Sequence, residues 1–158
     1  MRIGIALALA AVTGISGLVA VPGTAYAVNS NISGTACRNY NAAEATDIDY
    51  LTNSVRNLNA APRYVICPIV RSPTASNVVS IRVAGFTAPG TLISCTLTSY
   101  AIDGSTLGFQ SFTVQNPFIN VPFDQPLAAP GAFGGNATLL CLLPGNGGGV
   151  IYGIDVVQ

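Results

Sequence analysis

Apolar and polar residues alternate along several short segments of this chain. A period of two is typical of strands that turn one face to a core and the other to solvent. The segments that predict strands in this way are 63–71, 79–83, 93–97, 107–114, 119–123, 137–143 and 150–157. Segment 137–143 is apolar on both faces, so it is the best candidate for a central strand.

Turn-forming residues lie between these segments. Asp103-Gly104 separates two of the predicted strands and is a strong signal for a β-hairpin. Proline has no backbone N–H to donate, so Pro68 places its strand at an edge or over a bulge, and Pro122 places its strand at an edge. The glycine-rich segment 145–149 is interpreted as a flexible turn between two strands.

Three segments are harder to interpret. Residues 47–59 fit either a hairpin of two short strands or a helix, and we favour the hairpin because Asn53, Ser54 and Asn57 are turn formers. Residues 28–36 form a polar leader that becomes a first strand near Cys37. In 107–114 the apolar residues change parity, which predicts a bulge near Gln110 or Ser111.

The first 27 residues have the pattern of a secretory signal peptide. Arg2 gives a positive start, residues 3–21 are almost wholly apolar, and Ala25 and Ala27 are small residues at a cleavage site. A membrane anchor is the rival interpretation, but glycine and serine interrupt the apolar run. We therefore expect residues 1–27 to be removed and residues 28–158 to form one secreted domain without a membrane span.

The four cysteines all lie in the expected secreted part. They are Cys37, Cys67, Cys95 and Cys141. An even number of cysteines in an oxidising compartment predicts two disulfides, whereas a zinc site usually brings its ligands in close pairs. Three connectivities are possible, and we favour Cys37 with Cys67 and Cys95 with Cys141 because sequential pairing suits neighbouring strands.

Short strands separated by glycine, proline and asparagine predict an all-β fold. We expect a single antiparallel β-sandwich, immunoglobulin-like or jelly-roll-like, with two disulfides; a small barrel is the alternative. Cys95 and Cys141 share the inward parity of their strands, so their bridge would be buried, either across the sheets or within one. The chain has no tryptophan, which an antibody-type domain would carry in its core.

The composition excludes several functions. The net charge is zero, only 8% of residues are charged, and there is no histidine or lysine. A serine or cysteine nucleophile therefore has no histidine or lysine base, and no Schiff base can form. The sequence has no cluster of basic residues, so it gives no indication of binding to nucleic acid or to anionic lipid. We expect no enzyme activity and no cofactor.

Carboxylates are the remaining reactive groups, and three of them cluster at Glu44, Asp47 and Asp49. The simplest interpretation is a solvated or turn-capping loop. Calcium is an alternative ligand, because it prefers several hard oxygens, although the EF-hand pattern is absent. A catalytic pair for glycan hydrolysis is the least favoured interpretation. We therefore commit to no catalytic or metal residue.

Two further groups of residues have a binding and a structural interpretation. Tyr40, Tyr50 and Tyr64 either stack on sugars or are buried rings with a solvated hydroxyl group. The arginines of the same region either recognise carboxylates or pair with the acidic residues, and we favour pairing. These arginines are Arg56, Arg63 and Arg71.

These observations predict a small secreted domain that is not an enzyme and that serves as a binding or structural protein outside the cell or in its envelope. Its partner would be a glycan or an envelope protein. One alternative is a fimbrial-type subunit that exchanges strands, for which residues 28–36 would have to supply the donated strand. A carboxylate-based glycan hydrolase is the other.

Overall fold

The computed structural model describes residues 30–70, 80–114, 116–122 and 136–157. The expected signal peptide, Val28 and Arg71 lie outside the described residues. The strands are β1 (Ser30–Ser33), β2 (Arg38–Asn39), β3 (Ile48–Tyr50), β4 (Val55–Asn57), β5 (Arg63–Ile69), β6 (Ser80–Thr87), β7 (Ile93–Tyr100), β8 (Thr106–Val114), β9 (Phe118–Pro122), β10 (Asn136–Leu143) and β11 (Gly149–Val157). Two short 3₁₀ turns, η1 (Gly34–Ala36) and η2 (Ala42–Asp47), flank β2. No helix among the described residues has the length and apolar character needed to cross a bilayer.

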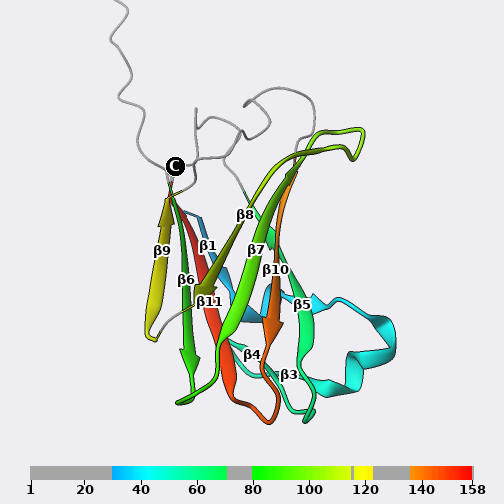
Figure 1. Cartoon of the computed structure of the whole chain (residues 1–158). Helices are drawn as coiled ribbons and strands as arrows, with labels where there is room; N and C mark the ends of the chain where they lie inside the picture. The colour runs from blue at the N-terminus through cyan, green and yellow to red at the C-terminus, as the bar shows by residue number, and fades with distance from the viewer. Residues whose placement is uncertain (1–29, 71–79, 115, 123–135, 158) are drawn as a thin grey trace, which may run out of the picture.

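The strands form two antiparallel sheets packed face to face (Figure 1). The six-stranded sheet has the order β3-β4-β11-β6-β9, and β1 also pairs with β11. The five-stranded sheet has the order β2-β5-β10-β7-β8. The strands β4-β11-β6-β9 facing β5-β10-β7-β8 have the connectivity of a jelly roll. The β-sandwich prediction is confirmed, and the jelly roll is the form it takes.

Several strand predictions are confirmed in detail. Residues 47–59 form the β3–β4 hairpin, and Asp103-Gly104 lies in the turn between β7 and β8. Strand β10 is the middle strand of the five-stranded sheet, and β9, which ends at Pro122, is an edge strand. The first strand, β1, ends at Ser33, and only the two-residue β2 follows Cys37.

The predicted bulge near Gln110 or Ser111 is wrong. The pairing of β7 with β8 is regular from Val114 to Gly108, and its irregularity lies opposite Tyr100, next to Leu107. The parity changes because Leu107 and Phe109 point away from the core and are exposed, whereas Phe112 and Val114 pack toward it. Apolar residues on the outer face of β8 therefore produced the false signal.

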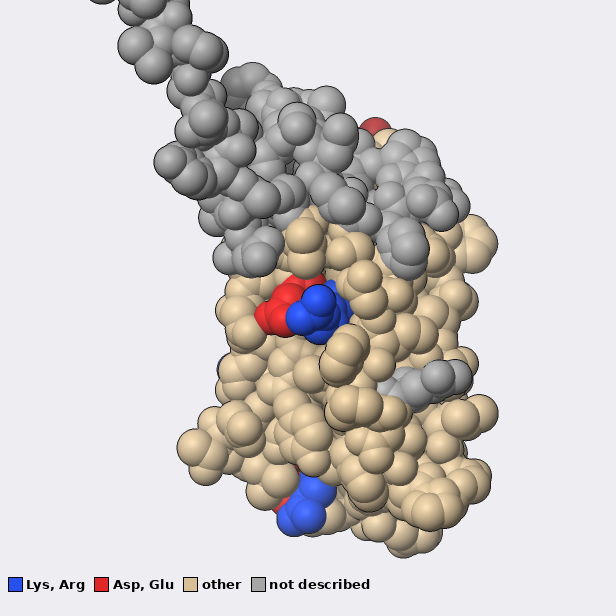
Figure 2. All heavy atoms as spheres, turned by 90° about the vertical axis from the view of Figure 1, so that its left-hand side faces the viewer, with Lys and Arg blue, Asp and Glu red and all other residues tan. Residues whose placement is uncertain are grey.

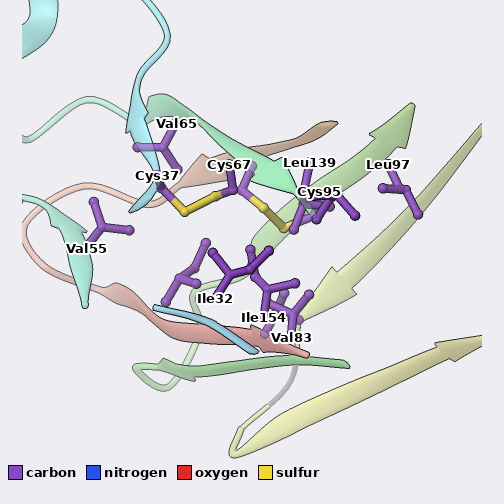
Figure 3. Close-up of a cluster of buried hydrophobic side chains, with 14 of the residues drawn as sticks. Ile32, Cys37, Val55, Val65, Cys67, Val83, Cys95, Leu97, Leu139 and Ile154 are labelled. Atoms are coloured by element: carbon purple, nitrogen blue, oxygen red, sulfur yellow. A yellow bond between two sulfur atoms is a disulfide. The ribbon is translucent and has the colours of Figure 1, made fainter. Parts of the chain in front are cut away.

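The core lies between the sheets and consists of aliphatic side chains and the two disulfides (Figure 3). Both predicted bridges are present, Cys37–Cys67 and Cys95–Cys141. Cys95 and Cys141 are directly opposite each other on β7 and β10, so this bridge lies within one sheet. Cys37 precedes β2 and bridges to β5, so both disulfides link neighbouring strands of the five-stranded sheet.

A buried asparagine fixes the loops at one end of the sandwich. The side chain of Asn57, at the end of β4, donates a hydrogen bond to the carbonyl of Ala61 at 2.8 Å. Its amide oxygen accepts one from the backbone N–H of Asn59 at 2.9 Å. The backbone carbonyl of Asn57 accepts from Gly147, where a positive φ of 67° suits a glycine. The glycine-rich segment 145–149 is thus a turn, as predicted, and Asn57 holds it against the β4–β5 loop.

Candidate functional site

The acidic cluster predicted from the sequence does not converge on one point. Asp47 accepts a hydrogen bond from the Arg63 guanidinium at 2.7 Å, and Glu44 lies 3.7 Å from the same group. Asp49, on β3, pairs with Arg56 on β4 at 2.8 Å. Within the described ranges, no three acidic or cysteine side chains are grouped so that they could hold a metal ion.

The arginines of this region therefore have the structural role that the sequence favoured. Arg56 and Arg63 pair with the acidic residues, while Arg71 lies outside the described residues. The hydrogen bond from Arg63 lowers the pKa of Asp47 below its ordinary value of 3.8. Asp103, in the β7–β8 turn, has a lowered pKa because the hydroxyl and the backbone N–H of Ser105 donate to it.

Calcium at millimolar concentration is expected to leave the melting temperature unchanged, because arginine side chains already neutralise these carboxylates and no metal ion is needed to do so. The triple variant Glu44→Gln, Asp47→Asn and Asp49→Asn removes three partly exposed ion pairs. Such pairs are worth about 0–1 kcal/mol each, so a small loss of stability is expected. Thermal unfolding with and without calcium tests both statements. A rise of several degrees that disappears in the triple variant would show a calcium site.

The three tyrosines are exposed, so the interpretation as buried rings is wrong. Tyr40 is 62% exposed, Tyr64 44% and Tyr50 40%. The rings of Tyr40 and Tyr64 are 6.3 Å apart and inclined by 67°. We call these three residues the tyrosine cluster. Short β2 brings it together, because the backbone N–H of Tyr40 donates to the carbonyl of Tyr64 across the β2–β5 pair.

A second group of side chains, which the sequence did not reveal, crosses the outer face of the six-stranded sheet. Asn31 on β1 is opposite Asp155 on β11, Asp155 is opposite Arg82 on β6, and Arg82 is opposite Asn120 on β9. The four residues alternate with buried neighbours along their strands, so their side chains share the outer face. We call this row the polar ladder. Its members are polar residues in four alternating strands, and the sequence holds no signal for their register.

Contacts within the polar ladder hold its side chains in place. The Asn31 amide donates a hydrogen bond to the Asp155 carboxylate at 2.6 Å. The Arg82 guanidinium lies over the Phe118 ring, 5.2 Å from its centroid. Asp155 and Arg82 are the two charged residues at outward positions of β1, β6, β9 and β11 as described. Figure 2 views the molecule from the side of β9 and β6, and shows one group of blue and red atoms in the middle and a second near the lower end of a largely uncharged surface.

Next to the polar ladder lies a row of small residues with aromatic rings beside it. Ser33, Gly153 and Ala84 are opposite one another across β1, β11 and β6, and Phe118 on β9 completes the row. Phe118 is 50% exposed. Tyr152, at the irregularity of β11 beside Gly153, is 44% exposed. Small side chains therefore lie beside both the polar ladder and the exposed ring of Phe118.

Comparison with known proteins gives no family. No protein-family model matches the sequence, and no curated protein matches it. A low-affinity xylan binding module from Roseburia intestinalis is a solved structure with a similar fold. It is 10% identical, with 83% of this chain and 96% of that chain covered and a TM-score of 0.48.

Two enzymes contain a similar part. The isomalto-dextranase of Arthrobacter globiformis is 14% identical over 81% of this chain and 23% of that chain, with a TM-score of 0.47. The β-(1,4)-mannanase of Podospora anserina is 12% identical over 82% of this chain and 28% of that chain, with a TM-score of 0.42. Similarity at this level assigns neither a ligand nor an activity to this chain.

Proposed function

We propose that this chain is an exported, non-catalytic domain that binds a neutral glycan on the outer face of its six-stranded sheet. The polar ladder beside Phe118 is the observation that carries the proposal. Sugar hydroxyls both donate and accept hydrogen bonds. The polar ladder offers an acceptor at Asp155, a donor at Arg82, and amides that do both at Asn31 and Asn120.

The dimensions of the polar ladder suit a chain of sugars. Neighbouring strands are about 4.8 Å apart, so four opposed residues extend over about 14 Å across the sheet. A short oligosaccharide laid across the strands would meet a polar side chain at each step. The hydrogen bond between Asn31 and Asp155 and the packing of Arg82 on Phe118 fix these side chains before binding, which lowers the entropy lost on binding.

The aromatic rings supply the apolar part of the recognition. One face of a sugar ring carries C–H groups, and such a face packs well on an aromatic ring. Phe118 and Tyr152 stand on two sides of the low row formed by Ala84 and Gly153. Arg82 and Asp155, together with the ion pair of Arg56 and Asp49 on β4 and β3, leave this face without net charge, which favours a neutral glycan over an acidic one.

A binding role is favoured over hydrolysis because hydrolysis of a glycosidic bond needs two carboxylates about 5–10 Å apart. Asp155 belongs to the polar ladder, whereas Asp49, the other carboxylate at the described outward positions of this sheet, pairs with Arg56. Glu44 and Asp47 pair with Arg63. Two buried disulfides support export to an oxidising compartment. Strand exchange has less support, because β1 pairs with β11 of its own chain and buries Ile32 there.

Phe118→Ala and Asp155→Asn are each expected to weaken glycan binding about tenfold or more. Such a loss equals about 1.4 kcal/mol, within the range of one charge-assisted hydrogen bond or one aromatic contact. Affinity electrophoresis in gels containing arabinoxylan, mixed-linkage β-glucan, galactomannan or dextran identifies the polysaccharide. Calorimetry with a short oligosaccharide of the same type then measures the affinity.

Ile102→Ala is the matched control, because Ile102 is 71% exposed in the β7–β8 turn, away from the polar ladder. It should leave binding unchanged. Polygalacturonate serves as the acidic probe. The proposal fails if none of the neutral polysaccharides binds, if only polygalacturonate binds, or if Phe118→Ala and Asp155→Asn bind as the unchanged protein does.

A further inference from the structure

The outer face of the five-stranded sheet carries a second set of exposed aromatic rings. Tyr40 and Tyr64 extend the β2–β5 pairing and occupy outward positions, because Val65 and Cys67 of the same strand point into the core. Their rings meet edge to face, with centroids 6.3 Å apart. This face and the polar ladder lie on opposite sides of the sandwich, since the two sheets pack against each other (Figure 1).

We call Tyr40 and Tyr64 the tyrosine pair. The side chains next to the tyrosine pair are first aliphatic and then, farther across the sheet, carry hydroxyl groups. Leu142 on β10 is opposite Tyr64, and Ser94 on β7 is opposite Leu142. In the next row Thr96 on β7 shares a hydrogen bond of 2.9 Å with Ser111 on β8. The outward positions described for β5, β10, β7 and β8 hold no charged side chain. This surface therefore offers rings, C–H groups and hydroxyls, and it suits an uncharged ligand.

The third tyrosine holds the edge of this surface in place. The hydroxyl of Tyr50, on β3 of the other sheet, accepts a hydrogen bond from the backbone N–H of Asn39 at 2.9 Å. The Arg38 guanidinium packs over the Tyr50 ring at 5.6 Å and donates to the carbonyl of Cys37 at 2.9 Å. These contacts, together with the disulfide of Cys37, fix β2 and so position Tyr40 before any ligand arrives.

We infer that the tyrosine pair forms a second neutral-glycan site, so that one molecule binds two polysaccharide chains on opposite faces and links them. The inference goes beyond the proposed function, which needs only the polar ladder. Arg38, which packs over Tyr50, is the one charged side chain at the described outward positions of β2, β5, β10, β7 and β8, so the surface around the tyrosine rings matches a neutral sugar. Stacking on Tyr40 and Tyr64 would supply the contact that their exposure leaves unused. Two linked sites convert weak binding of each chain into strong binding of a polymer network.

The experiment compares stoichiometry with cross-linking. Calorimetry with the short oligosaccharide is expected to give two sites per chain for the unchanged protein. Tyr40→Ala and Tyr64→Ala should each leave one site, at the polar ladder, with unchanged affinity. Phe118→Ala weakens the polar ladder site, so the site at Tyr40 and Tyr64 should remain with unchanged affinity. With the soluble polysaccharide, the unchanged protein should produce turbidity, and each single-face variant should reduce it about tenfold or more. Ile102→Ala should match the unchanged protein in both assays.

Each contrary result has a defined meaning. One site in the unchanged protein that Phe118→Ala abolishes and Tyr64→Ala spares would overturn the second site and keep the proposed function. Binding that only the tyrosine variants abolish would overturn the polar ladder site. A dimer without glycan in size-exclusion chromatography, dispersed by Tyr64→Ala, would show that a second copy occupies this face and would overturn the inference. Urea unfolding of each variant verifies that it is folded.

Discussion

Replacing Cys95 and Cys141 together by alanine is expected to lower the free energy of unfolding by about 3–5 kcal/mol. Both residues are buried and directly opposite each other on the central strands β7 and β10. The bridge closes a loop with a sequence separation of 46, and its removal frees the unfolded chain while it leaves a void in the core. A domain of this size has about 5–15 kcal/mol in total, so the variant would be close to unfolding at 37 °C.

Urea unfolding of the unchanged protein and the double variant measures this loss. The triple variant of Glu44, Asp47 and Asp49 is the control, since it removes exposed ion pairs and keeps both disulfides. If the triple variant unfolds while the cysteine variant remains stable, the acidic loop and not the disulfide is the structural element. That result would contradict the position of the bridge in the core.

Leu139→Ala is expected to lower the free energy of unfolding by about 2–5 kcal/mol, whereas Leu140→Ala should lower it by about 1 kcal/mol or less. Leu139 is fully buried on β10, between Cys67 of β5 and Leu97 of β7. Leu140 is its neighbour in the chain, but it points to the outer face of the same strand and is only half-buried. The two variants remove the same atoms and differ only in the face of the sheet.

Urea midpoints at constant m-value measure both changes. A shift of register by one residue would exchange the inner and outer faces of β10. Equal losses, or a larger loss for Leu140→Ala, would therefore contradict the pairing of β10 with β5 and β7. Far-UV circular dichroism of Leu140→Ala should be unchanged, because no core contact is removed.

The strands could be predicted from local pattern because alternation records which residues meet the core. This held for Ile81 and Val83 on β6, and for Ile93 and Leu97 on β7, all of which are buried. The favoured cysteine pairing is confirmed for a related reason, since Cys95 and Cys141 lie at inward positions of neighbouring strands and Cys37 directly precedes the strand that pairs with β5. The pattern failed at Leu107 and Phe109, where apolar side chains are exposed. Alternation shows which residues share a face, but it does not say which face is covered.

The candidate sites were less predictable than the strands. Tyr40, Tyr50 and Tyr64 were identified because they are close in sequence, but their exposure depends on the positions of β2 and β3 at the edges of the two sheets. The polar ladder was missed altogether, because Asn31 and Asp155 are 124 positions apart and still share a hydrogen bond. Polar residues in alternating strands are common. Their alignment depends on strand order and register, which no local pattern contains.

The sequence by itself determined that the chain forms short strands, that its four cysteines favour two disulfides, and that histidine and lysine chemistry is excluded. These properties follow from the residues and their immediate neighbours. Only the tertiary structure decided that the sandwich is a jelly roll, that both disulfides join neighbours in one sheet, and that Asn31, Asp155, Arg82 and Asn120 share a row. Each of these depends on contacts between distant segments, whose geometry is fixed when the two sheets close over the core.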